Sequence, residues 1–206
     1  TTGISDGIIK SFKLKTAPSV PNLFPGWMSE DIGNPLTAGA AWSTNGTSIL
    51  QLDSSSLNIA GTSDQFHIAY LPISADGEII ARVSSIEDAD DDAKAGVMIR
   101  ESSSVDAPHA SVLVTPTNGI RFFYRTQNGG DTSVQIATGL SAPYWVKVER
   151  RGSIFTASYS PLGKVWTTIG SVNINMSTDV LAGVCLTSKD TAATSSATFD
   201  NISVNE

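Results

Sequence analysis

Residues 117–130 read TNGIRFFYRTQNGG, and this stretch decides the fold. A run of strand-forming residues lies between two Asn-Gly pairs, Asn118–Gly119 and Asn128–Gly129. Asn-Gly is the strongest short hairpin signal, because both residues can adopt a positive φ. Alternate side chains of a strand point to opposite faces, which here separates Ile120, Phe122 and Tyr124 from Arg121, Phe123 and Arg125. The stretch therefore predicts a strand that turns back at both ends into antiparallel neighbours.

Similar runs, rich in Val, Ile, Phe, Tyr and Thr, recur between Gly, Asn, Asp and Pro turns along the whole chain. We expect strands at residues 7–15, 47–53, 65–72, 78–86, 95–102, 109–116, 120–127, 132–138, 144–152, 154–161, 166–174, 181–188 and 197–204. This spacing predicts an all-β fold, a two-sheet antiparallel β-sandwich of the jelly-roll type. Residues 27–206 are assigned to the sandwich. Residues 1–26 are expected to form an N-terminal edge strand with a proline-rich lead-in, the alternative being a linker from a preceding domain.

The composition excludes several classes of partner. The 206 residues carry a net charge of −7, and no run of Lys and Arg is long enough to bind nucleic acid. No apolar run approaches the roughly 18 residues of a membrane-spanning helix, so membrane insertion is not expected. Cys185 is the single cysteine, which excludes an internal disulfide and predicts a buried thiol in an apolar strand. No N-terminal signal peptide is visible, which leaves open a cytoplasmic protein or a mature piece of a secreted one.

The strands predict two kinds of sheet face. In 120–127 one face is apolar, and the other carries Arg121, Phe123 and Arg125. In AGVMIRES the second face carries Met98 and Arg100. A face of this mixed kind is half-open and can line a ligand cleft, but it also fits a solvated outer face.

Acidic residues crowd the loop before AGVMIRES, at Glu87, Asp88 and Asp90–Asp92. The loop lacks the glycine and the terminal glutamate of an EF-hand, so a solvated acidic loop is favoured over a calcium loop of another type. Glycosidases need a pair of carboxylates close together on one face, and no predicted strand presents two. No G-x-S-x-G elbow is present for a hydrolase triad either. The sequence therefore favours a protein that is not an enzyme, without deciding the matter.

Six segments in order resemble a bacterial domain family with the concanavalin A-like lectin/glucanase sandwich, related to a domain family of unknown function. They are SEDIGNPLTAGAAW (29–42), TSDQFHIAYLPISADGEIIARVSS (62–85), AKAGVMIRES (93–102), TPTNGIRFFYRT (115–126), PYWVKVERRGSIFTASYSPLGKVWTTIGS (143–171) and ATFDNISV (197–204). Such domains are often appended to secreted polysaccharide-degrading enzymes and to cell-surface proteins. The resemblance implies a non-catalytic, carbohydrate-associated module of a larger exported protein, secreted or at the cell surface, with neighbouring domains of that chain as further partners.

On this basis we expect a polysaccharide or other glycan to bind one sheet face. The residues predicted to bind it are His67, Arg100, Arg121, Phe123 and Arg125. Pairing of the arginines with Glu101 or Glu149 inside the protein is the alternative. By analogy with calcium-bearing sandwiches of this kind, Asp31 and Asp200 are the expected ligands of a structural calcium ion.

Two other functions remain open at this point. One is a structural or adhesive spacer that makes protein contacts. The other is a glycan hydrolase or lyase, in which His67, Tyr70 and Arg125 would be the reacting residues of a lyase.

Overall fold

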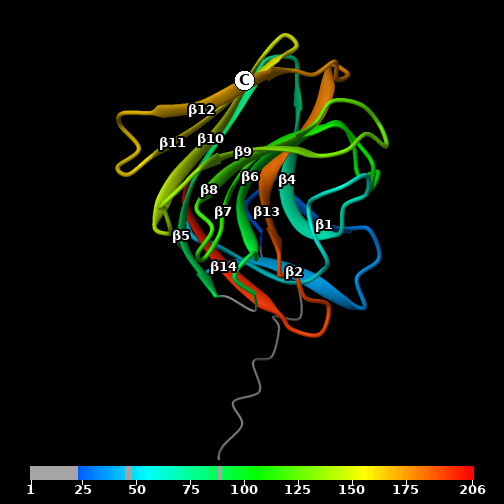
Figure 1. Cartoon of the computed structure of the whole chain (residues 1–206), viewed down its shortest axis with the longest axis vertical. Helices are drawn as coiled ribbons and strands as arrows, with labels where there is room; N and C mark the ends of the chain where they lie inside the picture. Colours follow the sequence, from blue (N-terminus) through cyan, green and yellow to red (C-terminus); the bar gives the residue numbers. More distant parts are fainter. Residues whose placement is uncertain (1–22, 45–47, 88–89) are drawn as a thin grey trace, which may run out of the picture.

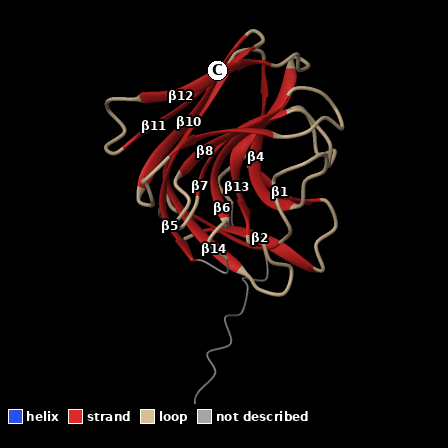
Figure 2. Ribbon diagram, in the orientation of Figure 1, coloured by secondary structure: helices blue, strands red, loops and turns tan. Residues whose placement is uncertain are grey.

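The structure is a computed structural model that describes residues 23–44, 48–87 and 90–206. These residues form strands, turns and loops and contain no helix (Figures 1 and 2). The expected strand at 7–15 lies outside the described residues, as does most of the lead-in at 1–26. No helix in the described ranges is long and apolar enough to span a membrane.

The fourteen strands pair antiparallel in two sheets of seven. The first sheet has the order β1 (Met28–Ile32), β4 (Phe66–Ser74), β13 (Asp179–Thr187), β6 (Lys94–Arg100), β7 (His109–Val114), β8 (Ile120–Arg125) and β9 (Ser133–Ala137). The second has the order β12 (Thr167–Asn173), β11 (Ile154–Ser160), β10 (Tyr144–Arg151), β5 (Gly77–Glu87), β14 (Ser195–Asn205), β3 (Leu50–Ser55) and β2 (Thr37–Ser43). This confirms the predicted two-sheet antiparallel sandwich.

The main core lies between the two sheets, and period-2 alternation builds it. On β8 the side chains of Ile120 and Phe122 are buried in this core, as the sequence predicted for that face. On β10 of the other sheet, Val146 and Val148 are buried in the same core from the opposite side. Burial of this continuous apolar layer is the main force that holds the sheets together.

A second, smaller core covers the outer face of the first sheet. Its members are Ile32, Ile59, Phe66, Ile68, Tyr70, Met98, Leu113, Phe123 and Cys185. All of these except Ile59 come from strands of the first sheet. Ile59 belongs to residues 56–65, hereafter the covering loop, and it is fully buried. The outer face is therefore packed under this loop, and it is not the half-open surface that the mixed pattern predicted.

Phe122→Ala should lower the free energy of unfolding by about 3–5 kcal/mol, because it removes a fully buried ring from the main core and leaves a cavity. Urea denaturation followed by tryptophan fluorescence measures the loss. Val165→Ala, at a site that is 79% exposed, is the control and should change little. A similar small change for both variants would contradict the assigned core.

Candidate functional site

Arg100 and Arg125, both predicted to bind glycan, are fully buried and meet at one carboxylate, Asp64. Arg125 binds it in bidentate fashion, with Nη1–Oδ2 at 2.8 Å and Nη2–Oδ1 at 2.7 Å. Arg100 adds a contact from Nη1 to Oδ2 at 3.3 Å. The two guanidinium groups face the protein interior, because Asp64 and the loop that carries it close over them.

Backbone carbonyls accept most of the other hydrogen bonds of these arginines. Arg125 donates to Gly61 O of the covering loop at 3.0 Å and to Ala107 O at 3.1 Å. Arg100 donates through Nε to Ser102 O at 2.6 Å. Arg125 also donates through Nε to Gly130 O at 2.9 Å, in the loop between β8 and β9. The network therefore ties three loops, residues 56–65, 101–108 and 126–132, to the outer face of the first sheet.

The sequence left open whether the arginines bind a glycan or pair with carboxylates inside the protein. Arg100 and Arg125 are paired internally, with Asp64 as the partner in place of Glu101 or Glu149.

The two carboxylates that the sequence suggested as partners are engaged elsewhere. Glu149 pairs with Arg151, with Oε1 3.0 Å from Nη2. Glu101 accepts a hydrogen bond from the Ser177 amide at 2.8 Å.

His67 lies on the opposite face of the sheet from Arg100. Its neighbours Phe66 and Ile68 belong to the second core, so alternation turns His67 toward the second sheet. There Nδ1 lies 2.8 Å from Asp31 Oδ1, and the ring is 3% exposed. The prediction that His67 lies on the same sheet face as the arginines was therefore wrong. Alternation shows which residues of one strand share a face, but it does not show which face of the sheet that is for another strand.

The other two predicted residues also have protein partners. Phe123 is 5% exposed in the second core, with the Nζ of Lys94 5.7 Å from its ring centroid. Arg121 is partly exposed and pairs with Asp92, with Nη1–Oδ1 at 2.8 Å. Asp92, from the acidic loop that precedes β6, also binds Lys94. The predicted residues therefore do not form one exposed binding face.

The expected calcium ligands lie in different sheets. Asp31, on β1, binds His67 and the Gly39 amide. Asp200, on β14, accepts hydrogen bonds from Arg82 at 3.1 Å and from Ser84 at 2.7 Å. Within the described ranges no group of three or more His, Cys, Asp or Glu residues is placed to hold a metal ion.

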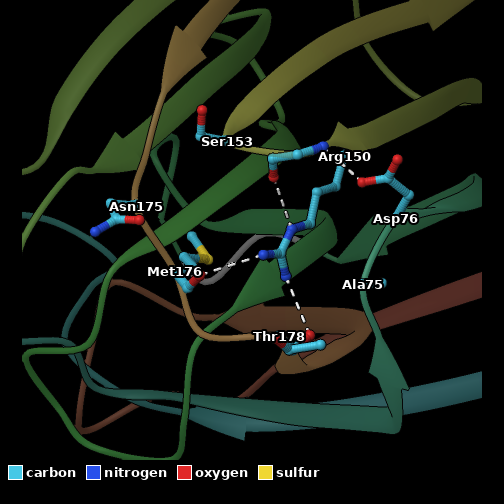
Figure 3. A pocket seen from close by; sticks show the side chains of 8 residues that line it. Ala75, Asp76, Arg150, Ser153, Asn175, Met176 and Thr178 are labelled. Atoms are coloured by element: carbon cyan, nitrogen blue, oxygen red, sulfur yellow. Dashed lines mark hydrogen bonds between the residues drawn. The ribbon is translucent and has the colours of Figure 1, made fainter.

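An open pocket lies at the end of the sandwich, where the turns β4–β5 and β10–β11 meet the segment between β12 and β13 (Figure 3). Its volume is about 230 Å³. The residues that line it are Ala75, Asp76, Arg150, Gly152, Ser153, Asn175, Met176 and Thr178. We call it the Arg150 pocket. The C-terminal end of β14 lies nearby, because Asn205 pairs with Glu78 at the start of β5 (Figure 1).

Arg150 is the positively charged residue that lines this pocket. It continues the inward-facing row of Val146 and Val148 on β10 and is only 6% exposed. Its guanidinium donates to three carbonyls: Nε to Gly152 at 3.0 Å, Nη2 to Met176 at 3.2 Å and Nη1 to Thr178 at 3.3 Å (Figure 3). Its Cζ also lies 5.6 Å from the ring centroid of Phe155. These contacts fix the guanidinium in place at the pocket wall.

Gly152 joins Arg150 to Asp76. Its carbonyl accepts from Arg150, and its amide donates to Asp76 Oδ1 at 2.5 Å (Figure 3). Gly152 has a φ of +58°, a conformation that glycine adopts without strain. One turn residue therefore places a cationic donor and an anionic acceptor on the same pocket, while Asn175 and Ser153 supply further amide and hydroxyl groups.

Arg150 is not among the binding residues predicted from the sequence, although the sequence contains a signal for it. In YWVKVERR, Val146, Val148 and Arg150 share one face, so the pattern puts a charge at an inward-facing position just before a Gly turn. A charge at such a position is rare in a sheet core and marks a place with a special partner.

Two further pockets have less suitable linings. One, of about 490 Å³, is lined by Gly33, Asn34, Leu57, Asn58, Ser63, Asp64, Gln65 and Val105, and its charged residue, Asp64, is already neutralised. The other, of about 320 Å³, is lined by Ser84, Ser85, Ile86, Pro116, Ser141 and Ala142, and none of these residues is charged. The Arg150 pocket is the one of the three that offers both a charged donor and a charged acceptor.

No protein-family model and no curated protein matches the chain. Solved structures do match it. A functionally unknown protein from Saccharomyces cerevisiae is 14% identical, with a TM-score of 0.66 over 86% of this chain and 94% of that one. The carbohydrate-binding module CBM66 from Bacillus subtilis is 16% identical, with a TM-score of 0.56 over 88% and 96%. A Bauhinia forficata lectin, solved in complex with GalNAc, is 9% identical, with a TM-score of 0.53 over 88% and 92%. These similarities show a lectin- and glucanase-like sandwich fold.

Asp64→Asn should lower the free energy of unfolding by about 3–5 kcal/mol, because it leaves two buried guanidinium groups without a counter-charge. Chemical denaturation at pH 7 measures the change. Asp131→Asn removes an exposed carboxylate and serves as the matched control. Equal stability of the two variants would show that the network contributes nothing.

His109 should make the fold less stable as the pH falls from 7 to 5. Burial lowers its pKa to about 3, with Asp64, Arg100 and Arg125 as its charged neighbours. An exposed imidazole has a pKa of about 6.5, so in this range the unfolded chain takes up a proton that the folded chain does not. The resulting loss is about 2 kcal/mol. It should be absent from His109→Gln when the two proteins are compared by urea denaturation at both pH values; the same loss in both would contradict the assignment.

Proposed function

We propose that the chain is a non-catalytic carbohydrate-binding module that holds a saccharide in the Arg150 pocket. The observation that carries the proposal is the joint presence of a fixed guanidinium, a carboxylate and uncharged polar groups around one open hollow. Sugar hydroxyls are both donors and acceptors, and pockets with a few convergent polar groups bind them with defined orientation. Met176, which is 8% exposed, supplies apolar surface for a sugar ring.

Two considerations support binding over catalysis. The residues lining the pocket include a single carboxylate, Asp76, whereas glycosidases of the usual kind use two. The residues named for a lyase, His67, Tyr70 and Arg125, are buried, and burial together with Glu30 raises the pKa of Tyr70 to about 12. A tyrosine with so high a pKa is a poor general base.

The fold also supports the proposal, since similar solved structures include a carbohydrate-binding module and a lectin. As the family resemblance implies, we place the module in a larger secreted or cell-surface protein with neighbouring domains. A structural calcium ion remains a prediction of that resemblance alone, and Asp31 and Asp200, which lie in different sheets, are not brought together to hold it.

A glycan array followed by isothermal titration calorimetry tests the proposal. The ligand found should bind Asn175→Ala at least tenfold more weakly, because loss of one hydrogen bond costs about 1.4 kcal/mol, which is a tenfold change in Kd. Asn175 is exposed, so the variant should keep the wild-type melting temperature.

Asn34→Ala, in the 490 Å³ pocket, is the matched control and should bind normally. The opposite pattern would move the site to that pocket. An array with no ligand, from protein with a cooperative melting transition, would favour the spacer function.

A further inference from the structure

We infer that the Arg150 pocket selects a neutral saccharide unit, bound through hydroxyls that accept from Arg150 and donate to Asp76. This inference rests on the proposed function and names its ligand class. The buried cations of the protein differ in their partners. Lys94, Arg100 and Arg125 each have a carboxylate partner. Within the described part of the chain, Arg150 has neutral carbonyl partners and no ion pair.

Arg150 keeps donors for a ligand. A guanidinium has five N–H groups, and the three hydrogen bonds to Gly152, Thr178 and Met176 use one from each nitrogen. One N–H therefore remains on each terminal nitrogen. No described residue accepts these two hydrogens, and the side chain lines the open pocket (Figure 3). Two free donors on neighbouring nitrogens can bind oxygen acceptors of a ligand.

Asp76 provides the complementary acceptor. Its Oδ1 binds the Gly152 amide, while no hydrogen bond from the described residues uses Oδ2. Arg150 and Asp76 form no ion pair with each other, although Gly152 connects them. A hydroxyl can accept from one side and donate to the other, so a sugar carrying adjacent hydroxyls can satisfy both charged groups at once.

The charge around the pocket favours a neutral ligand over an acidic one. Three more carboxylates bind residues beside it: Glu101 at Ser177, and Asp179 and Glu206 at Ser74. The neighbouring Arg151 is paired with Glu149. Together with Asp76 these carboxylates therefore outnumber the cations, and the chain as a whole is acidic. A uronate or sulfate group would meet this negative field, and like charges brought together reduce affinity.

The size of the pocket limits the ligand. Its 230 Å³ lies below the roughly 300–1,000 Å³ of pockets that enclose drug-sized molecules. The pocket therefore holds one sugar unit, and the rest of a glycan would extend into solvent at the end of the sandwich.

The test titrates the whole chain with methyl glucoside, methyl galactoside and methyl mannoside, and with the corresponding methyl glycosides of glucuronate and galacturonate. The Arg150 side-chain Nε–Hε resonance is followed by NMR, together with the Kd. At least one neutral glycoside should shift this resonance and bind at least tenfold more tightly than its uronate. Its Kd should change less than twofold between 50 and 500 mM NaCl, because no ligand charge is neutralised.

Asp76→Asn, at an exposed turn, should weaken the neutral glycoside and narrow its advantage over the uronate. Arg150→Gln should abolish binding of the neutral glycoside and, with it, the advantage over the uronate. The melting temperature of this variant is measured alongside, because the Arg150 side chain is buried. Tighter binding of the uronates, with a steep dependence on salt, would overturn the neutral ligand while keeping the proposed function. Saccharide binding that is unchanged in Asp76→Asn and does not shift the Arg150 resonance would overturn the site, and absence of any binding would overturn both proposals.

Discussion

The structure depends on one buried carboxylate, Asp64, held between Arg100 and Arg125. Each of the three charged side chains is fully buried. A lone charge in such a position would be very costly, so each is stable only because the others and the nearby carbonyls compensate it. Asp64 belongs to the covering loop, and the contact therefore fixes that loop on the first sheet. A sandwich whose outer face could have been open is closed by this interaction.

Closure of that face removes the outer side of the first sheet as a candidate ligand surface. With the covering loop in place, Met98 and Phe123 form a second core and are lost as a ligand platform. Among the three pockets described, the one with both a charged donor and a charged acceptor lies at the end of the sandwich, where turns leave the sheets. Gly152 holds the central position there, because its amide binds the Asp76 carboxylate while its carbonyl binds the Arg150 guanidinium.

The sequence predicted the strands from β3 onward well, because alternation and Gly or Asn turns are local properties. It missed β1 and β2, since MSEDI is mostly polar and TAGAAWS is mostly small, and these segments are strands because they pair with β4 and β3. The facing of His67 and the burial of Arg125 could not be predicted in the same way. Asp64 lies 36 residues from Arg100 and 61 from Arg125, so nothing local distinguishes these two arginines from exposed ones.

Cys185 gives the second core a chemical reporter. The thiol lies in the second core with Ile59 of the covering loop, and burial raises its pKa well above the ordinary value. A thiol must be exposed and ionised to react with an alkylating reagent. Since the chain has no other cysteine, the rate of alkylation in native buffer measures how often this layer of the molecule opens, and a rate above that of global unfolding would reveal local opening of the layer.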